Sequence, residues 1–315
     1  MMLSFTVPAG PDRKAYNILR RELKASAALV RRLKQANAIF VDGQPAFTDR
    51  MLQPGQTLTA DLDACEPPSD LIRESGPLTV LYEEEGFLAV HKPAGCLIHP
   101  THARNSGTLC NLAAGYLQAR GQLPVVHAVN RLDRDTEGVV LLAKNSHFHA
   151  LLSDALSAKD AGKEYLALVC GTMPQTDCCI DLPIRRVNEL DMKREVSPDG
   201  QRAVTHCRVL ASDGRLSLLG LRLETGRTHQ IRVHCAHLGC PLLGDKLYGT
   251  PASLTLSDEL GITTQQLLAA RLRFTHPLTG APMEIFCGPA RPEFARLAEE
   301  LLGRPLSAAE LPDLP

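Results

Sequence analysis

The apolar positions of this chain follow two different patterns. Over residues 15–23 and 26–35 they recur three and four positions apart, which predicts two short helices, with Ser26 as the N-cap of the second. Farther along, most apolar positions form short runs or alternate with polar residues, which is typical of strands. The pattern therefore predicts a small helical unit followed by a larger, strand-rich region.

The small unit is expected to continue with strands. These strands are predicted over residues 38–41, 44–47 and 56–62. The dipeptide Asp42-Gly43 separates the first two, and Asp-Gly between such runs favours a tight hairpin turn. A helix-helix-hairpin-strand unit is therefore expected over residues 12–64, and the Pro-containing, polar segment 65–77 has the composition of a linker.

The larger region is expected over residues 78–302, with a C-terminal tail at 303–315. Its helices are predicted over residues 109–117 and 148–156. Its strands are predicted over residues 78–82, 87–91, 139–142, 164–169, 203–210, 217–223 and 284–287. Strands and helices do not alternate regularly, so the pattern favours a mixed, strand-rich domain over a repeated strand-helix-strand architecture.

Composition places the chain among ordinary globular proteins. Its 315 residues include 44% hydrophobic and 22% charged residues, enough for a sizeable core and two domains. No apolar run approaches the roughly 18 residues that cross a bilayer, and residues 1–10 lack the features of a signal peptide. We therefore expect a cytoplasmic protein without a membrane partner.

The ten cysteines do not form a recognisable framework, because no C-x-x-C motif occurs. We interpret them as reduced and mostly buried. The alternative is a metal site within one short segment. Its candidate ligands are His229, His234, Cys235, His237 and Cys240.

Charge is spread unevenly, although the net charge is only −1. Residues 11–50 hold nine Lys and Arg against four acids, whereas residues 51–85 hold eight acids and one Arg. The second predicted helix carries Arg31, Arg32 and Lys34 near one face, which indicates either a solvated surface or an RNA contact. The sequence L-K-Q-A-N-A-I-F-V-D-G-Q-P that starts at Leu33, with the Q-P-G-Q-T-L that follows, resembles the S4-type RNA-binding domain.

The stretch 130–144 concentrates charge directly before the apolar run 139–142. Its ionisable residues before that run include Arg131, Asp133, Arg134 and Asp135. An Asp in this setting can form a structural ion pair, bind a metal or act as a catalytic carboxylate. A calcium-loop template fails, because Lys144 stands where the last carboxylate is needed.

A second charged segment is predicted to form a helix over residues 229–238 with Thr228 as its cap. Arg227 lies just before this helix and Arg232 lies within it. An Arg on a rigid helix can bind a carboxylate or phosphate with two hydrogen bonds, yet an exposed charged helix is the plainer interpretation. Tyr165, at the start of a predicted strand, is by itself most simply a half-buried packing residue.

These segments together resemble the RluA-type pseudouridine synthases. Asn130–Gly138 resembles their H-R-L-D-x-x-T-S-G motif, and Lys163-Glu-Tyr165 resembles their K-x-Y strand. Residues 225–234 and 244–249 resemble their longest signature. The resemblance extends from about Leu78 to Pro289, with the S4-type unit ahead of it, as in many members.

The resemblance implies an α+β fold with a mixed, mainly antiparallel central sheet, and the isomerisation of uridine to pseudouridine in RNA. It implies that Asp133 is the catalytic carboxylate, that Arg232 keeps this carboxylate ionised, and that Tyr165 stacks on the target base. Further RNA contacts are expected from Arg131, Thr136, Arg227, His229, Arg31, Arg32 and Lys34. The uridine must be flipped out, and the reaction needs no cofactor or metal.

Large-subunit ribosomal RNA is the first expected substrate, transfer RNA is the second, and a monomer is the expected state. Asn130 and Glu137 depart from the family, which usually has His and Ser there. Two other functions stay open at this point. One is a non-catalytic RNA-binding factor, and the other is a glycoside hydrolase, which would need Asp135 or Asp245 as a second acid.

Overall fold

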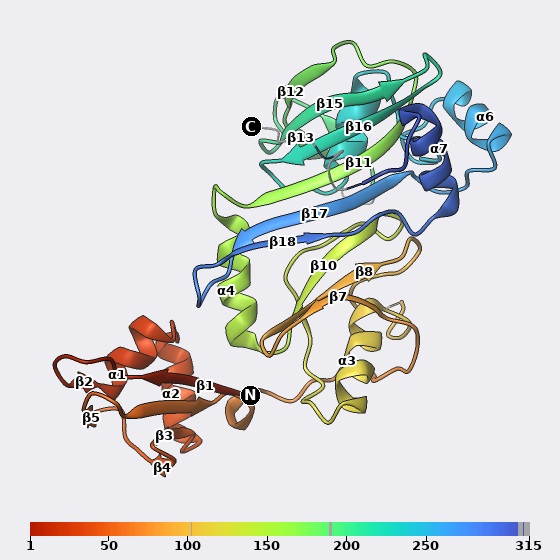
Figure 1. Ribbon diagram of the computed structural model, residues 1–315. Helices are drawn as coiled ribbons and strands as arrows, with labels where there is room; N and C mark the ends of the chain where they lie inside the picture. Colours follow the sequence, from red (N-terminus) through yellow and green to blue (C-terminus); the bar gives the residue numbers. More distant parts are fainter. Residues whose placement is uncertain (102, 189–190, 308–310, 312–315) are drawn as a thin grey trace.

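The computed structural model describes residues 1–101, 103–188, 191–307 and 311. Figure 1 shows a small N-terminal unit beside a long, strand-rich domain. Part of the predicted tail at 303–315 lies outside the described residues. No helix in the described part of the chain is long and apolar enough to cross a bilayer.

The N-terminal unit contains a four-stranded sheet, a two-stranded pair and four helical segments. The sheet has the order β1 (Met2–Thr6), β6 (Thr57–Asp61), β3 (Ile39–Val41) and β4 (Gln44–Pro45), and β2 (Arg13–Lys14) pairs with β5 (Met51–Leu52). The helical segments are α1 (Ala15–Asn17), a π-helical turn (Ile18–Glu22), α2 (Ala27–Gln35) and a 3₁₀ turn (Asp63–Cys65). The predicted cap is confirmed, because Ser26 Oγ accepts a hydrogen bond from Leu29 N at 3.1 Å. Strand β1 was not predicted from the sequence.

The large domain is built on a ten-stranded sheet, and the predicted α+β class with a mainly antiparallel sheet is confirmed. Eight strands follow the order β12 (Asp177–Asp181), β15 (Val204–Ser212), β16 (Leu216–Leu223), β11 (Gly162–Cys170), β17 (Leu267–Thr275), β10 (Glu137–Ala143), β8 (Phe87–Lys92) and β7 (Thr79–Glu83). Strands β18 (Pro282–Phe286) and β9 (His127–Ala128) pair with β17 and β10, and β13 (Ile184–Arg186) and β14 (Arg194–Val196) form a separate hairpin.

The helices of this domain are α3 (Leu109–Ala119), α4 (Ser146–Ser157), α5 (Gln230–His237), α6 (Pro251–Glu259) and α7 (Pro292–Leu302). Strand β10 is buried on both faces. Val140 and Leu142 pack with α3, whereas Val139 and Leu141 belong to the cluster that contains Phe148 of α4. Burial on both faces explains why this strand is a continuous apolar run.

The sheet consists of two antiparallel parts that meet where β10 pairs with β17 in parallel. The register joins Glu137 to Leu268 and Gly138 to Ala269. Gly138 has a φ of 127°, and a Cβ placed on it would lie 2.2 Å from the carbonyl oxygen of Ala269. The parallel seam, defined as these two register pairs, therefore requires glycine at this position.

The N-terminal unit is docked on the start of α4. Arg32 Nη2 donates a hydrogen bond to Ser146 Oγ at 3.1 Å, and His147 Nε2 lies 3.1 Å from the carbonyl oxygen of Leu23. Ser146 donates from its backbone N and its Oγ to the carboxylate of Glu66, each at 2.9 Å. One network therefore joins α2, the segment after the N-terminal unit, and α4.

Candidate active site

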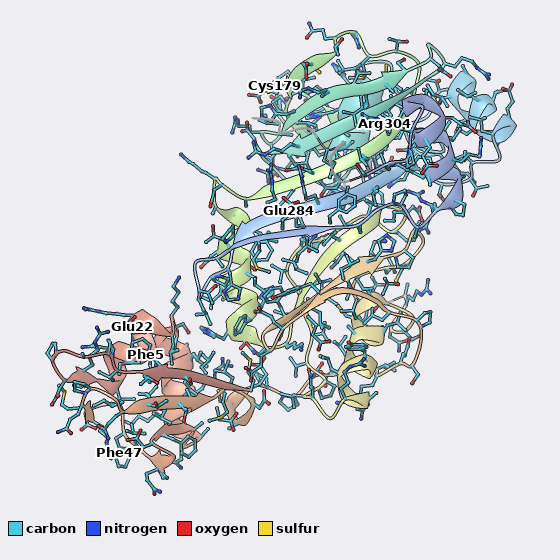
Figure 2. All side chains as sticks on the ribbon, in the orientation of Figure 1. Phe5, Glu22, Phe47, Cys179, Glu284 and Arg304 are labelled. Carbon is cyan, nitrogen blue, oxygen red and sulfur yellow. The ribbon has the colours of Figure 1, made fainter. Side chains whose placement is uncertain are left out.

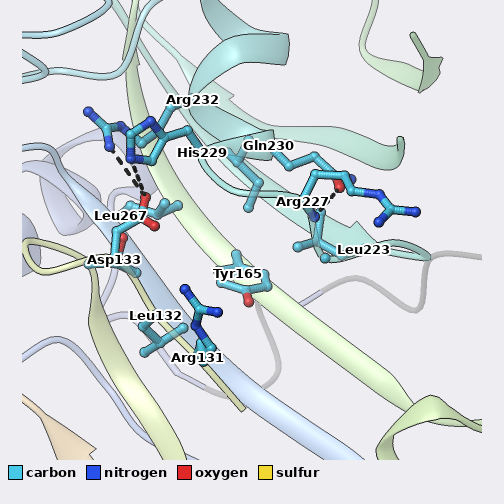
Figure 3. A pocket seen from close by; sticks show the side chains of 13 residues that line it. Arg131, Leu132, Asp133, Tyr165, Leu223, Arg227, His229, Gln230, Arg232 and Leu267 are labelled. Carbon is cyan, nitrogen blue, oxygen red and sulfur yellow. Dashed lines mark hydrogen bonds and ion pairs between the residues drawn. The ribbon is translucent and has the colours of Figure 1, made fainter. Parts of the chain in front are cut away.

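Asp133 lies in the loop before β10, and two basic side chains approach one of its oxygens. Arg232 Nη1 donates a hydrogen bond to Asp133 Oδ2 at 3.3 Å, and His229 Nε2 lies 3.8 Å from the same oxygen. Figure 3 shows these two side chains at Asp133, with Tyr165 and Arg131 lining the same pocket. The Asp133 side chain is 27% exposed, so a carboxylate is presented to solvent beside a fixed positive charge.

Arg232 is held in place by a second carboxylate. Its Nε and Nη2 donate to the two oxygens of Asp245 at 2.7 and 2.9 Å, and its guanidinium lies over the ring of Tyr248. Burial opposes the charged form, but the hydrogen bonds and charge of Asp245 raise the pKa of the Arg232 guanidinium. Arg232 therefore stays protonated, and its Nη1 is left to face Asp133.

Tyr165 projects from β11 into the same hollow. Burial, together with the negative charge of Asp133, raises the pKa of the Tyr165 phenol, so the hydroxyl stays protonated. The ring is partly buried against the apolar cluster of β11, β16 and α5. A neutral aromatic ring next to a carboxylate provides a surface on which a planar base can stack.

Seven predicted site residues line one cavity of ≈ 80 Å³, namely Arg131, Asp133, Thr136, Tyr165, Arg227, His229 and Arg232. A larger groove of ≈ 740 Å³ shares Asp133, His229 and Arg232 with this cavity. The structure thus brings together side chains from the loop before β10, from β11 and from α5. The other three predicted RNA contacts, Arg31, Arg32 and Lys34, lie on α2.

The loop that carries Asp133 is held by Lys92, which is not among the predicted site residues. Lys92 is fully buried, and its Nζ donates to the carbonyl oxygens of Pro93, Cys96 and Arg134 at 2.9, 2.9 and 2.7 Å. Burial lowers the pKa of Lys92 to about 8. The residue type alone gave no signal, because a buried ammonium cannot be inferred from an isolated Lys.

The two departures from the family pattern are accommodated differently. Asn130 Nδ2 donates to Val139 O at 3.1 Å, and its Oδ1 accepts from Leu141 N at 2.8 Å, so Asn130 aligns the loop with β10. Glu137 is buried, and its Oε2 lies 3.2 Å from Arg291 Nε. Thr136, beside it, accepts a hydrogen bond from Gln265 Nε2 at 2.9 Å.

The helix predicted over residues 229–238 is present, but its predicted start and its predicted exposure are wrong. Helix α5 begins at Gln230 after His229, which has a left-handed backbone and no side-chain cap, so Thr228 is not the cap. Residues 230–235 are buried because α5 packs behind β11 and β16. The charge of Arg232 is tolerated there because Asp245 compensates it.

Two alternatives from the sequence, a glycoside hydrolase and a metal site, lose support from the contacts of their key residues. Asp245 is 1% exposed and binds Arg232, and an Arg134 hydrogen bond lowers the pKa of Asp135, so neither is suited to act as the acid of a glycoside hydrolase. His234 engages Thr205 Oγ1 and the carbonyl oxygen of Leu182. In the described residues, no group of three or more His, Cys, Asp or Glu side chains is arranged to hold a metal.

Comparisons with known proteins agree with this geometry. Residues 86–237 match the family model described as RNA pseudouridylate synthase. The chain is 38% identical to Uncharacterized RNA pseudouridine synthase YhcT of Bacillus subtilis (strain 168), over 84% of this chain and 85% of the relative. It is 37% identical to Ribosomal large subunit pseudouridine synthase D of Xanthomonas campestris pv. campestris, over 89% of this chain and 85% of the relative.

Solved structures share the fold. Human RNA Pseudouridylate Synthase Domain Containing 1 superposes with a TM-score of 0.57 at 23% identity, covering 74% of this chain and 98% of the human chain. Human RNA Pseudouridylate Synthase Domain Containing 4 gives the same score and identity over 71% and 93%. Sequence relatives, fold and the grouping of motif residues around one cavity agree: the chain belongs to the RNA pseudouridylate synthase family and is an RNA pseudouridine synthase, an isomerase.

Proposed function

We propose that this enzyme converts specific uridines of large-subunit ribosomal RNA to pseudouridine, with Asp133 as the catalytic carboxylate. The observation that carries the proposal is the arrangement of Arg232, which binds Asp245 with two nitrogens and Asp133 with the third. A partly exposed carboxylate with a rigid cationic partner is suited to attack or to deprotonate a nucleotide.

The target uridine is flipped out of its helix before it reacts. The glycosidic bond of a stacked nucleotide cannot be reached by a carboxylate that lines a cavity. Tyr165 lies in that cavity and offers its ring to the base, whereas Arg131 and Arg227 line the rim and can bind phosphates. Cleavage of the N-glycosidic bond, rotation of the uracil and bonding through carbon 5 then require no outside reactant.

The ribosomal substrate is proposed on the names of relatives. Proteins called Ribosomal large subunit pseudouridine synthase D from Xanthomonas campestris, Pasteurella multocida and Vibrio cholerae are 37–39% identical to this chain. Transfer RNA is the second candidate. A monomeric state and a cytoplasmic location, both expected from the sequence, remain predictions.

The N-terminal unit is proposed to be an S4-type RNA-binding module. Arg31 and Lys34 are exposed on α2, whereas Arg32 makes the contact with Ser146 that docks the unit on α4. Phe47 is 71% exposed on the side of the unit that faces away from the large domain (Figure 2). A docked module presents the charges of α2 at a fixed distance from Asp133. This distance restricts the RNA shapes that can contact α2 and the Asp133 cavity at the same time.

The catalytic role of Asp133 is tested with Asp133→Asn, using Asp154→Asn on the exposed side of α4 as the matched control. Ribosomal RNA that lacks pseudouridine is incubated with each variant, and the product is mapped by chemical modification and primer extension. Asp133→Asn should fold normally, bind RNA and form no product, whereas Asp154→Asn should match the wild type. Turnover by Asp133→Asn would refute the role.

The RNA is identified by mapping pseudouridines in total RNA from cells with and without the gene. Loss of a site in large-subunit ribosomal RNA is expected. Loss confined to transfer RNA would support the second candidate. If no site is lost and the wild-type protein forms no product, the protein is a non-catalytic RNA-binding factor instead.

A further inference from the structure

His229 has contacts that go beyond its expected role as an RNA contact. Its Nδ1 lies 2.7 Å from Tyr248 Oη, while its Nε2 points toward Asp133 Oδ2 at 3.8 Å. The side chain is 9% exposed, and the backbone has a φ of 60°, which is uncommon for a residue with a Cβ. Both ring nitrogens therefore have defined neighbours, and the ring is held by a constrained backbone at the start of α5.

The contacts of Tyr248 determine where the imidazole proton lies. Tyr248 Oη accepts a hydrogen bond from the backbone N of Arg194 at 2.9 Å. Burial raises the pKa of Tyr248 to about 12, so the phenol keeps its single proton. Among the described residues, the remaining close partner of this hydroxyl is His229 Nδ1, so the proton is donated there.

If His229 Nδ1 carried the proton instead, Tyr248 Oη would accept two hydrogen bonds, and its own proton would have to leave this network for solvent. Burial also lowers the pKa of His229, although the charge of Asp133 opposes this shift. The charged groups around the ring are Asp133, Arg232, Asp245 and Arg194. A neutral ring whose Nδ1 accepts must carry its proton on Nε2.

We propose that Tyr248 holds His229 as the neutral Nε2–H tautomer, and that His229 and Arg232 together direct their donors at Oδ2 of Asp133 so that Oδ1 is the oxygen that meets the substrate. His229 is thus a positioning residue that acts through Asp133. The 3.8 Å separation is too long for a hydrogen bond and must shorten when the nucleotide fills the cavity. The proposal rests on the proposed role of Asp133.

The tautomer is measured without any reaction. Long-range proton–nitrogen NMR of the labelled full-length protein gives the protonation of both imidazole nitrogens, and His229→Gln identifies the signals by subtraction. The expected result near neutral pH is a protonated Nε2 and an unprotonated Nδ1, with Tyr248→Phe weakening this preference. A protonated Nδ1, or an imidazolium, in the wild-type protein would overturn the proposal.

The effect on the reaction is measured by single-turnover kinetics on the RNA substrate. His229→Ala and Tyr248→Phe should slow the chemical step, the former roughly tenfold to a hundredfold, with little change in RNA affinity. His229→Gln places an amide donor near the position of Nε2 and should recover most of the rate. The control is His237→Gln, exposed at the other end of α5, which should equal the wild type.

The outcomes separate this proposal from the function on which it rests. Full activity of His229→Ala, or equal loss in the Ala and Gln variants with an unchanged fold, would contradict the positioning role. If the wild-type protein forms no pseudouridine on any RNA, the proposed function fails, and the NMR measurement still decides the tautomer.

Discussion

The buried pair between Glu137 and Arg291 connects β10 to the start of α7, and its removal should be strongly destabilising. We consider Arg291→Met, which keeps the length of the side chain. The Glu137 side chain is 1% exposed and that of Arg291 is 11% exposed, so the loss leaves an uncompensated carboxylate inside the protein. Breaking such a pair costs about 3–5 kcal/mol, which corresponds to a fall in Tm of roughly 6–20 °C for a domain of this size.

The loss of stability caused by Arg291→Met should depend on pH. Burial raises the pKa of Glu137 in the folded protein, and the charge of Arg291 opposes this rise. Without Arg291 the folded-state pKa rises further, whereas the unfolded-state pKa stays ordinary. Ionised Glu137 therefore opposes folding only above the unfolded-state pKa, and the loss of stability in Arg291→Met should be larger at about pH 8 than at about pH 5.

The assay is urea and thermal unfolding followed by circular dichroism in a double-mutant cycle with Glu137→Gln. In the Arg291→Met background, Glu137→Gln removes the buried charge and should restore part of the lost stability, whereas in the wild-type background it should destabilise. Arg296→Met is the control, because Arg296 forms an exposed pair with Glu300 on the same helix and should change stability by about 0.5 kcal/mol or less. Equal effects of Glu137→Gln in both backgrounds would refute the reasoning.

Three further predictions concern other contacts. Gly138→Ala places a Cβ against the carbonyl oxygen of Ala269 and should destabilise by more than about 4 kcal/mol in thermal unfolding; a Tm within a few degrees of wild type would contradict the close approach. Lys92 has a folded-state pKa of about 8 against an ordinary 10.5, so it binds its proton less readily when folded, and its contribution to stability should rise with pH between these values. The Tm of Lys92→Met should therefore lack this contribution between about pH 8 and pH 10.5. A pH dependence of Tm equal to that of the wild type would count against a buried ammonium. Arg32→Met removes a docking hydrogen bond and should speed tryptic cleavage after the exposed Arg73, which gel analysis would follow; an unchanged rate would argue against this contact holding the N-terminal unit.

The sequence predicted elements well where one physical pattern dominated. The apolar run of β10 was recognisable because both faces of the strand are buried. Strand β17 was missed because Arg271 and Arg273 interrupt its apolar pattern, and both pair with the buried carboxylate of Glu164 across the sheet. A charge that is compensated by a residue more than a hundred positions away leaves no local signal.

The candidate site shows the same limit. Spacing alone could not unite Asp133, Tyr165 and Arg232, which lie on separate elements, and the family resemblance supplied that grouping. The resemblance included Asp245 within residues 244–249 but did not indicate its contact with Arg232, which depends on the packing of α5. Nor did it indicate the contact of Tyr248 with His229, which depends on the left-handed backbone of His229.

The parallel seam between β10 and β17 has a consequence for the order in which the enzyme is made. Synthesis delivers Asp133 with the first antiparallel part of the sheet, whereas Tyr165 on β11 and Arg232 on α5 come with the second part, whose seam strand β17 ends at Thr275. The two parts can meet only after that strand has left the ribosome, since a parallel pairing joins segments far apart in the chain. A growing chain therefore contains its carboxylate long before it can modify RNA, because the site is complete only once β17 has been made and paired.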